Sequence, residues 1–289
     1  MRDVVVCSDE GYLDYSIVAL YSIFKHSRDP KNLRFWHLAV EFDDRAKAKL
    51  ADCEQRLGFK VNRVDLNSDR MKDFPVEGHI TLATYSRIFI SDLLPESVET
   101  VLYVDCDLIA LDSVEDLFQE FKREHVLAAV KNPTFTRAAE LGLEPGCPYF
   151  NSGVMLMDLR KMRDLGVPQE IARICTSGIR LLYLDQDALN VYLKGHWQPL
   201  DHRWNVQHSM FPRSRFLFWK RGEYKVTRRR PSILHFSSSV KPWSYHCTHP
   251  YLGVYRQYYL RSLGKELSPR PGSLKQRIKK AVKLALLFN

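Results

Sequence analysis

Short apolar runs and amphipathic stretches alternate along the first half of the chain. Runs of about four to eight residues rich in Val, Ile and aromatic side chains indicate strands, and apolar residues at helical spacing indicate helices. The predicted strands are residues 4–7, 33–40, 60–64 and 101–104, and the predicted helices are residues 15–25, 43–57 and 84–93. This alternation predicts an α/β fold with a mostly parallel, doubly wound central sheet. In such a sheet, ligands bind beyond the carboxyl ends of the strands.

The pattern after residue 107 is more mixed and contains no internal repeat. It predicts strands at residues 153–159 and 232–236 and helices at residues 167–176 and 185–193. Residues 268–272 contain two prolines and a glycine, which interrupt both helix and strand and therefore indicate a linker. We expect one domain over residues 1–266, followed by a linker and a terminal helix over residues 267–289.

The segment after this linker, Ser273 to Phe288, has the pattern of a basic amphipathic helix. Its apolar face consists of Leu274, Ile278, Ala281, Val282 and Ala285, and its other side of Lys275, Gln276, Arg277, Lys279, Lys280 and Lys283. Such a helix either binds an anionic membrane surface or docks on the body of the protein with its lysines in water. We favour membrane binding by residues 273–288, because the helix follows a linker and has no acidic residue.

The composition is that of a globular protein. Of the 289 residues, 45% are hydrophobic and 27% are charged, which argues against disorder. No apolar run approaches the roughly 20 residues that span a bilayer, and no signal-peptide pattern precedes the first strand. The six cysteines form no C-x-x-C pair, which argues against a structural zinc site. We therefore expect a cytoplasmic protein with reduced thiols.

The net charge of +9 is distributed unevenly. Residues 209–231 and residues 261–289 each contain eight Lys or Arg and one acidic residue, which gives each segment +7 and leaves −5 on the rest of the chain. This distribution indicates two local contacts with anionic partners and argues against a broad nucleic-acid-binding surface.

Two aspartates follow the predicted strand at residues 101–104. Asp105 and Asp107 stand at i and i+2, so their side chains point to the same side, and two converging carboxylates suit a divalent cation. Apolar residues lie on both sides of the pair, and burying two carboxylates there without a partner would be costly. An Asp-x-Asp motif alone is weak, because strand-end aspartates also cap helices and form turns.

His235 is a third candidate metal ligand. A lone histidine in an apolar run is more often a hydrogen-bonded core residue, but here Ser237, Ser238 and Ser239 follow, and then Lys241. Small residues with free backbone N–H groups, followed by a lysine, suit a phosphate group. Two carboxylates, one imidazole and phosphate oxygens together favour Mn²⁺, with Mg²⁺ as the second choice.

Two further polar clusters each have a structural and a functional interpretation. Asn151, Ser152 and Gly153 indicate a tight turn entering a strand, or an amide placed against sugar hydroxyls. Asp185 is either an N-cap with Gln186 in the first helical turn, or part of a helix start that directs polar groups into a sugar pocket.

Six segments, taken in their order along the chain, resemble glycosyltransferase family 8. The resemblance is greatest to the bacterial lipopolysaccharide α-galactosyl- and α-glucosyltransferases, with glycogenin as a more distant relative. The matching segments are Ser8–Tyr12, Thr84–Arg87, Asp105–Asp107, Phe150–Val154, Asp185–Asp187, and His235 with Lys241–Trp243. The resemblance extends from about Val4 to Trp243, and six ordered matches are far more specific than any one of them. It implies a single Rossmann-like catalytic domain of the GT-A type over residues 1–266, a UDP-sugar donor, Mn²⁺ and retention of anomeric configuration.

The resemblance also implies a role for individual residues. The metal ligands would be Asp105, Asp107 and His235. The nucleotide and diphosphate would be bound by Asp9, Tyr12, Lys241 and Ser238, and the donor sugar by Arg87, Asn151, Asp185 and Gln186. Two positions depart from the galactosyltransferases, which have asparagine in place of Gly11 and glycine in place of Ser238.

Retention of configuration allows two mechanisms. A carboxylate beneath the anomeric carbon would act as a covalent nucleophile, as in retaining glycosidases. The resemblance instead places Gln186 near that face, and an amide is a poor nucleophile. We therefore expect attack from the same face, with the leaving phosphate accepting the proton of the acceptor, and we keep Asp185 as the alternative nucleophile.

The predicted activity is transfer of galactose or glucose from UDP to an oligosaccharide or lipid-linked glycan. A lipopolysaccharide core is the preferred acceptor, and a capsule glycan or a protein is the alternative. The predicted location is the cytoplasm, peripherally on the inner face of the cell membrane.

Two other classes of protein compete with this prediction. One is a non-catalytic sugar-binding relative of the same fold, which the intact candidate site argues against. The other is a nucleic-acid-binding protein, because aromatic and basic residues alternate in Phe216–Arg221 and could stack bases. We prefer to interpret that segment as a loop over the acceptor or at the membrane, and we expect no nucleic-acid partner.

Overall fold

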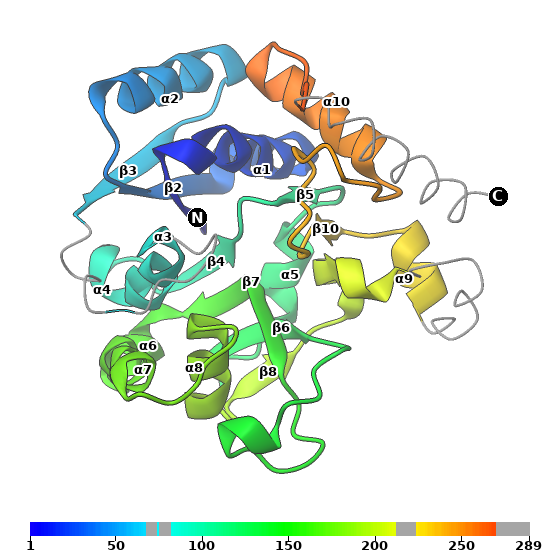
Figure 1. Cartoon of the computed structure of the whole chain (residues 1–289). Helices are drawn as coiled ribbons and strands as arrows, with labels where there is room; N and C mark the ends of the chain where they lie inside the picture. Colours follow the sequence, from blue (N-terminus) through cyan, green and yellow to red (C-terminus); the bar gives the residue numbers. More distant parts are fainter. Residues whose placement is uncertain (68–73, 75–81, 212–223, 270–289) are drawn as a thin grey trace.

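The computed structural model describes residues 1–67, 74, 82–211 and 224–269 (Figure 1). Its central sheet has seven strands in the order β3-β2-β1-β4-β7-β6-β8, and a second sheet has three strands in the order β5-β10-β9. The strands are β1 (Arg2–Asp9), β2 (Leu33–Val40), β3 (Val61–Leu66), β4 (Thr100–Val104), β5 (Leu108–Ala110), β6 (Leu127–Lys131), β7 (Phe150–Asp158), β8 (Trp197–Pro199), β9 (Val206–Gln207) and β10 (Ile233–His235).

Helices connect most of these strands. The described α-helices are α1 (Leu13–His26), α2 (Asp44–Leu57), α3 (Leu82–Tyr85), α4 (Ile90–Leu93), α5 (Glu115–Glu120), α6 (Leu159–Asp164), α7 (Val167–Thr176), α8 (Asp185–Tyr192), α9 (Lys225–Arg229) and α10 (Leu252–Leu263). The short 3-10 helices are η1 (Glu10–Tyr12), η2 (Pro30–Asn32), η4 (Ser86–Phe89), η5 (Ala139–Leu141), η6 (His202–Asn205) and η7 (His208–Met210).

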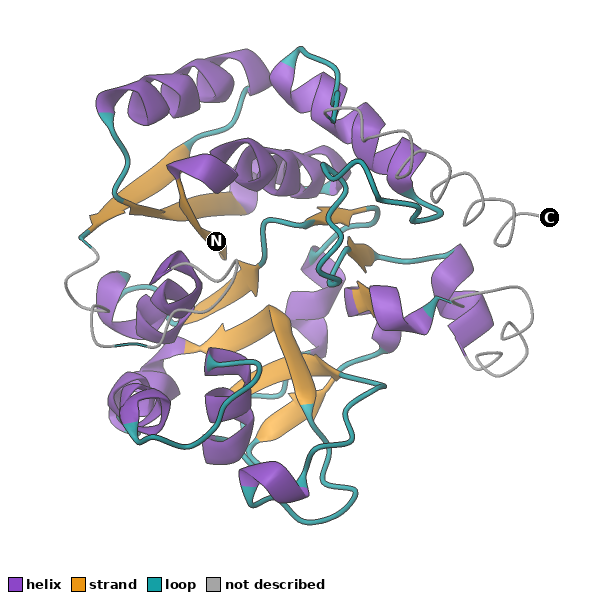
Figure 2. Ribbon diagram, in the orientation of Figure 1, coloured by secondary structure: helices purple, strands orange, loops and turns teal. Residues whose placement is uncertain are grey.

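Different helices cover the two faces of the large sheet (Figure 2). Because side chains alternate along a strand, Val4 and Val6 of β1 enter one apolar cluster, whereas Val5 and Cys7 enter another. Residues of α1, α10 and the small sheet complete the first cluster, and residues of α4, α6, α7 and α8 complete the second. The sheet is therefore buried on both faces, as the near-continuous apolar strands predict.

The prediction of a mostly parallel α/β sheet is confirmed. Strands β1, β2, β3 and β4 pair in parallel, and so do β6 and β8, whereas β7 runs antiparallel to both β4 and β6. The helix predicted at residues 43–57 is α2, where Asp43 is the N-cap and accepts a hydrogen bond from the backbone N–H of Ala46. Gly58 ends this helix with φ of 76°, which glycine adopts without strain.

Two local predictions are wrong. Asn151–Gly153 is not a turn but lies within β7, where a register shift opposite Ala129 and Val130 accommodates the polar segment. The side chain of Asn190 supports this strand by accepting a hydrogen bond from the backbone N–H of Phe150. Residues 84–93 do not form one helix, because the 3-10 turn η4 separates α3 from α4.

Helix α10 packs on α1 and was not predicted. The imidazole of His26 on α1 shares a hydrogen bond with the Tyr258 hydroxyl, and Arg56 of α2 donates to the carbonyl of Ser262. None of the described helices is long and apolar enough to cross a membrane. The predicted helix at residues 273–288 and the segment Phe216–Arg221 lie outside the described residues.

Candidate active site

The candidate site lies where several strands of the large sheet end. Strand β1 ends at Asp9, and β4 ends at Val104, immediately before Asp105. Because β7 is antiparallel, it begins at this same edge, and the backbone N–H of Asp105 donates to the carbonyl of Gly153 at 2.9 Å. Residues from three parts of the sequence therefore meet here, at the position where open α/β sheets bind ligands.

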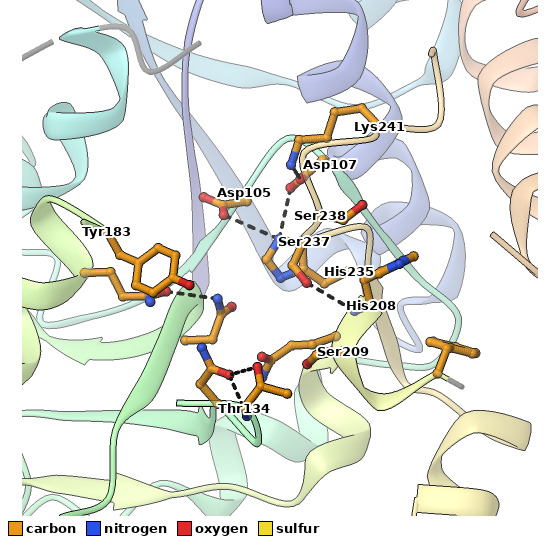
Figure 3. Close-up of a pocket in the computed structure, with 15 residues that line it drawn as sticks. Asp105, Asp107, Thr134, Tyr183, His208, Ser209, His235, Ser237, Ser238 and Lys241 are labelled. Atoms are coloured by element: carbon orange, nitrogen blue, oxygen red, sulfur yellow. Dashed lines mark hydrogen bonds and ion pairs between the residues drawn. The ribbon is translucent and has the colours of Figure 1, made fainter. Parts of the chain in front are cut away.

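A cleft of about 320 Å³ opens at this edge (Figure 3). Its lining residues are Asp105, Asp107, Asn132, Thr134, Asn151, Tyr183, Gln186, Gln207, His208, Ser209, Phe211, His235, Ser237, Ser238 and Lys241. The cleft therefore brings together candidate ligands from widely separated parts of the chain.

Of the eleven predicted site residues, seven line the cleft and four lie beside or behind it. The four outside the lining are Arg87 and Asp185, which are buried, and Asp9 and Tyr12, which are half-buried. Seven of the predicted side chains are therefore open to the cleft, and the other four lie next to its lining.

Three predicted metal ligands converge at one end of the cleft. Nε2 of His235 lies 3.1 Å from Oδ1 of Asp107 and 3.5 Å from Oδ2 of Asp105. The small sheet produces this approach, because β10 pairs with β5 and the backbone N–H of Phe236 donates to the carbonyl of Asp107 at 2.9 Å. His235, more than a hundred residues from the aspartates in sequence, is thereby placed against them.

Lys241 completes this group, and we call Asp105, Asp107, His235 and Lys241 the charged cluster (Figure 3). The Lys241 ammonium forms an ion pair with Oδ2 of Asp107 and donates to the carbonyl of Phe236 at 3.3 Å. Burial acts to raise the pKa of Asp107, but the Lys241 ammonium and the contact with the His235 ring outweigh it and hold that pKa well below the usual carboxyl range. Burial acts to lower the pKa of Lys241, and Asp107 more than offsets this and raises it.

Gly153 leaves the space that the charged cluster occupies. A Cβ atom at this position would lie 2.2 Å from Cε1 of His235 and 2.7 Å from Oδ2 of Asp105. Both distances are far below van der Waals contact, so no side chain fits here without displacing a candidate ligand. Residue 153 must be glycine because His235 and Asp105 approach it closely, and not because of its backbone angles.

These residues fit a divalent cation. One ligand atom from each of Asp105, Asp107 and His235 lies within 4.8 Å of the others, and this is the one such group of three that the described part of the chain contains. Two carboxylates and an imidazole form a donor set suited to Mn²⁺. Asp105, Asp107 and His235 could therefore hold a metal, as the sequence predicts.

Arg87 lies behind the charged cluster. Its Nη1 is 2.9 Å from Oδ1 of Asp105 and its Nε is 2.9 Å from Oδ2 of Asp185. Burial raises the pKa of Asp185 to about 6, although the Arg87 guanidinium opposes the shift. Arg87 thus bridges two carboxylates, and its buried position lets it fix the orientation of Asp105.

Gln186 presents its amide to the cleft from the first turn of α8. Its Oε1 accepts hydrogen bonds from Nδ2 of Asn151 at 2.9 Å and from the backbone N–H of Ser152 at 3.0 Å, and its Nε2 donates to the Tyr149 hydroxyl at 3.0 Å. Asn205 donates from Nδ2 to Oδ1 of Asn151 at 2.8 Å. We call Tyr149, Asn151, Gln186 and Asn205 the amide network.

Asp185 is not the N-cap of α8, which was one of its two predicted roles. The N-cap is Leu184, which has φ of 44°, and Asp185 is the first helical residue with its carboxylate directed at Arg87. Asp187 accepts hydrogen bonds from the backbone N–H groups of Leu182 and Tyr183, at 2.8 and 2.9 Å. Asp187 therefore holds the preceding loop in place, while Gln186 faces the cleft.

Asp9 and Tyr12 lie at the end of β1, beside the cleft lining. Oδ1 of Asp9 accepts a hydrogen bond from the backbone N–H of Tyr12 at 3.1 Å, which makes Asp9 the N-cap of η1. The Tyr12 ring meets Trp243 edge-on at 5.8 Å, and Trp243 stacks on Tyr15 at 3.5 Å. These rings join the end of β1 to the segment that carries Lys241.

Several cleft residues were not predicted. Gln207 donates from Nε2 to the carbonyl of Lys131 at 3.1 Å, and the backbone N–H of His208 donates to the Ser237 hydroxyl at 3.1 Å. Asn205, beside the cleft, is fully buried between Trp204 and Val206, which are also fully buried. A buried polar side chain must have hydrogen-bond partners, but Asn205 stands in a mainly polar segment, so the sequence carries no signal for its burial.

Comparison with known proteins agrees with this architecture. The model of the family described as glycosyl transferase family 8 matches residues 3–247. The chain is 26% identical over 262 residues to general stress protein A of Bacillus subtilis, covering 88% of this chain and 92% of that protein. It is 28% identical over 268 residues to lipopolysaccharide 1,2-glucosyltransferase of Escherichia coli, covering 91% of this chain and 78% of that protein.

A solved structure shares the fold. The galactosyltransferase LgtC, in complex with donor and acceptor sugar analogs, superposes with a TM-score of 0.76 and 24% identity, covering 96% of this chain and 100% of that chain. The family match extends over both the charged cluster and the amide network. By this match over most of its length, the chain belongs to glycosyl transferase family 8.

Proposed function

We propose that this protein is a Mn²⁺-dependent, retaining glycosyltransferase that moves galactose or glucose from a UDP-sugar to a glycan acceptor. The convergence of Asp105, Asp107 and His235 at the edge of the sheet carries the proposal. A divalent cation bound by these residues would neutralise the negative charge that develops on the leaving diphosphate. Mg²⁺ is the alternative cation.

The nucleotide would lie between the charged cluster and the end of β1. Lys241 remains charged at neutral pH, since Asp107 raises its pKa, and it supplies a positive charge for the diphosphate. Ser238 lines the same part of the cleft and offers a hydroxyl to a phosphate oxygen. We assign the uridine to the neighbourhood of Asp9 and Tyr12.

The donor sugar would lie against the amide network. Asn151 and Gln186 line the cleft, and neutral amides suit the hydroxyl groups of a hexose. Arg87 and Asp185 would act from behind, Arg87 by orienting Asp105 and Asp185 by holding Arg87.

Attack from the same face is the mechanism that this arrangement favours. The bond between the anomeric carbon and the phosphate oxygen breaks, the bond to the acceptor oxygen forms, and the proton of the acceptor passes to the phosphate. Asp185, the alternative nucleophile, is only 2% exposed and is paired with Arg87. Detection of a glycosyl adduct on Asp185 by mass spectrometry would contradict our choice.

For the acceptor we propose a lipid-linked glycan, with a lipopolysaccharide core as the first choice. The named activity of the Escherichia coli relative supports this choice. Membrane attachment through residues 273–288, on the inner face of the membrane, would bring the enzyme to such an acceptor. Anionic liposomes should bind the full chain but not a chain that ends at Ser268.

The decisive experiment is a panel of UDP-hexoses assayed for UDP release with Mn²⁺, with Mg²⁺ and with EDTA. We expect release with UDP-galactose or UDP-glucose that depends on the metal. Release that continues unchanged in EDTA would contradict the metal assignment, and absence of release from every donor, with and without glycan acceptors, would favour a non-catalytic sugar-binding protein.

A further inference from the structure

A chain of hydrogen bonds connects the charged cluster to the amide network. It runs from Nδ1 of His235 to Oδ1 of Asn205 at 3.0 Å, and from Nδ2 of Asn205 to Oδ1 of Asn151 at 2.8 Å. It continues from Nδ2 of Asn151 to Oε1 of Gln186 at 2.9 Å. Nε2 of Gln186 then donates to the Tyr149 hydroxyl at 3.0 Å, and that hydroxyl donates to Oδ1 of Asp187.

Backbone groups fix the direction of the hydrogen bonds between His235 and Tyr149 in this chain. The N–H of Ser152 donates to Oε1 of Gln186 at 3.0 Å, so this atom is the amide oxygen and not the nitrogen. The N–H of Gly153 donates to Oδ1 of Asn151 at 3.1 Å in the same way. Asn205 must therefore turn its NH₂ group toward Asn151, which leaves its oxygen facing His235.

An amide oxygen can only accept a hydrogen bond. Nδ1 of His235 must therefore carry a proton, and Nε2 is left to face Asp105 and Asp107. His235 is 2% exposed and Asn205 is fully buried, so water does not compete for this contact. The partner of the second nitrogen of a metal-bound histidine orients the ring and strengthens the ligand.

We infer that Asn205 is a positioning residue that orients His235 for the metal and links it to the Gln186 amide. This inference rests on the proposed function, because it takes His235 to be a metal ligand. Asn205 itself is absent from the cleft lining and would touch neither donor nor acceptor. It acts through His235 on the metal side and through Asn151 on the donor-sugar side.

The link couples the two sides of the cleft at Asn205. A rotation of the Asn205 amide would place its NH₂ group against His235 and its oxygen against Oδ1 of Asn151, so both contacts would be lost together. The metal and the donor sugar should therefore stabilise the same arrangement of these side chains, and binding of one should favour binding of the other.

Two substitutions separate the contacts of Asn205. Asn205→Leu removes both hydrogen bonds at nearly constant volume. Asn205→Asp keeps an acceptor for His235 but removes the donor to Asn151. Asn190→Leu is the matched control, because Asn190 is also a buried asparagine beside β7, and its side chain bonds to the backbone of Phe150 and Gln186 rather than to a candidate ligand.

The measurement is binding of Mn²⁺ to the full chain, with and without UDP, by the electron paramagnetic resonance signal of free Mn²⁺. Asn205→Leu should weaken Mn²⁺ binding by about 10- to 100-fold. Asn205→Asp should retain it within about 3-fold but lower kcat for UDP-hexose turnover, because Asn151 loses its donor and a shift in the donor-sugar site is costly. Asn190→Leu should leave Mn²⁺ affinity unchanged.

Wild-type affinity in a folded Asn205→Leu variant would overturn the inference, and so would a loss in Asn205→Asp as large as in Asn205→Leu. If Asn205→Leu does not fold, the Asn205→Asp variant decides alone, because unchanged kcat would show that the link to Asn151 has no role. If the wild-type chain binds no Mn²⁺ with or without UDP, the proposed metal site fails and the inference fails with it. If the wild-type chain binds Mn²⁺ and neither Asn205 variant changes Mn²⁺ affinity or kcat, the inference is wrong and the proposed metal site stands.

Discussion

The charged cluster and the amide network lie side by side in one cleft but are built in different ways. In the charged cluster, Asp107 is held between Lys241 and His235, and its pKa is strongly lowered by them. In the amide network, Gln186 is held by neutral partners, which include Asn151, the backbone of Ser152, and Tyr149. The first is fixed by charge and the second by directional hydrogen bonds.

This difference predicts different sensitivities. Interactions between charges respond to pH, salt and bound metal, whereas a buried network of neutral groups responds to the loss of a donor or an acceptor. Substitutions in the charged cluster should therefore change metal binding, and those at the far end of the amide network should change turnover and stability.

The largest effect is expected from Asp107→Asn. It removes a candidate metal ligand and the anionic partner of Lys241. We expect Mn²⁺-dependent UDP release to fall by at least about 100-fold. UDP release at saturating Mn²⁺ measures this, and activity close to wild type would show that the cluster is not the metal site.

Gly153→Ala should disrupt the charged cluster without changing any charge. Its Cβ would collide with His235 and Asp105, so Mn²⁺ affinity should fall by at least about 10-fold. The strain should also reduce the free energy of unfolding by about 1–3 kcal/mol. Titration with Mn²⁺ and urea unfolding measure the two effects.

Gly253→Ala is the control for this substitution. Gly253 lies in α10, and a Cβ added there would have no other atom within 4 Å. Alanine should therefore be tolerated and should stabilise the helix by up to about 1 kcal/mol. Equal Mn²⁺ affinity in Gly153→Ala and Gly253→Ala would contradict the close-approach argument.

Tyr149→Phe tests the far end of the amide network. It removes the hydroxyl that joins Gln186 to Asp187, and the free energy of unfolding should fall by about 1–2 kcal/mol. We expect kcat to fall by roughly 10-fold because the Gln186 amide is less well fixed. Mn²⁺ affinity should stay near wild type, since Asn151 and Asn205 remain in place.

A second tyrosine provides the matched comparison. The Tyr192 hydroxyl donates to the carbonyl of Leu165 at an exposed position, so Tyr192→Phe should change stability by less than about 0.5 kcal/mol. A loss of Mn²⁺ affinity in Tyr149→Phe as large as in Gly153→Ala would show that the two parts cannot be separated.

The smallest effect is a pH dependence of stability in the absence of metal. The pKa of Asp107 is lower in the folded protein than in the unfolded chain, where an aspartate has a pKa of about 3.9. Its contribution to stability is therefore present above about pH 4 and is lost as the pH falls through that value toward the folded pKa. Urea unfolding in EDTA between pH 6 and pH 3 should show a shallower fall in Asp107→Asn than in wild type, whereas Tyr149→Phe should follow the wild-type slope.

The sequence predicted several of the longer strands and helices well because their signals are local. The strand at residues 33–40 and the helix at residues 167–176 have the predicted bounds, and Asp43 caps α2 as its position suggests. Strands β5, β8 and β9 have only two or three residues each, which is too short for a periodic pattern. They exist because partners distant in sequence supply their hydrogen bonds.

The candidate site divides in the same way. Asp105, Asp107 and His235 could be proposed from residue type, spacing and resemblance, and the structure brings their ligand atoms together. Asn205 could not, because a single asparagine has no motif, and its role depends on which partners surround it. The turn predicted at Asn151–Gly153 was wrong for a related reason, since the pairing of β7 with β4 and β6 overrides the local preference.

The sequence by itself determined the α/β class, the order of the early elements and the chemical types of the candidate ligands. These depend on side-chain periodicity and on functional groups, which are properties of the chain. The tertiary structure alone decided that β7 runs antiparallel, that Gly153 must lack a side chain and that Asn205 connects His235 to Asn151. Such features arise from contacts between residues far apart in sequence, and hydrogen-bond direction and close packing appear only when those residues meet.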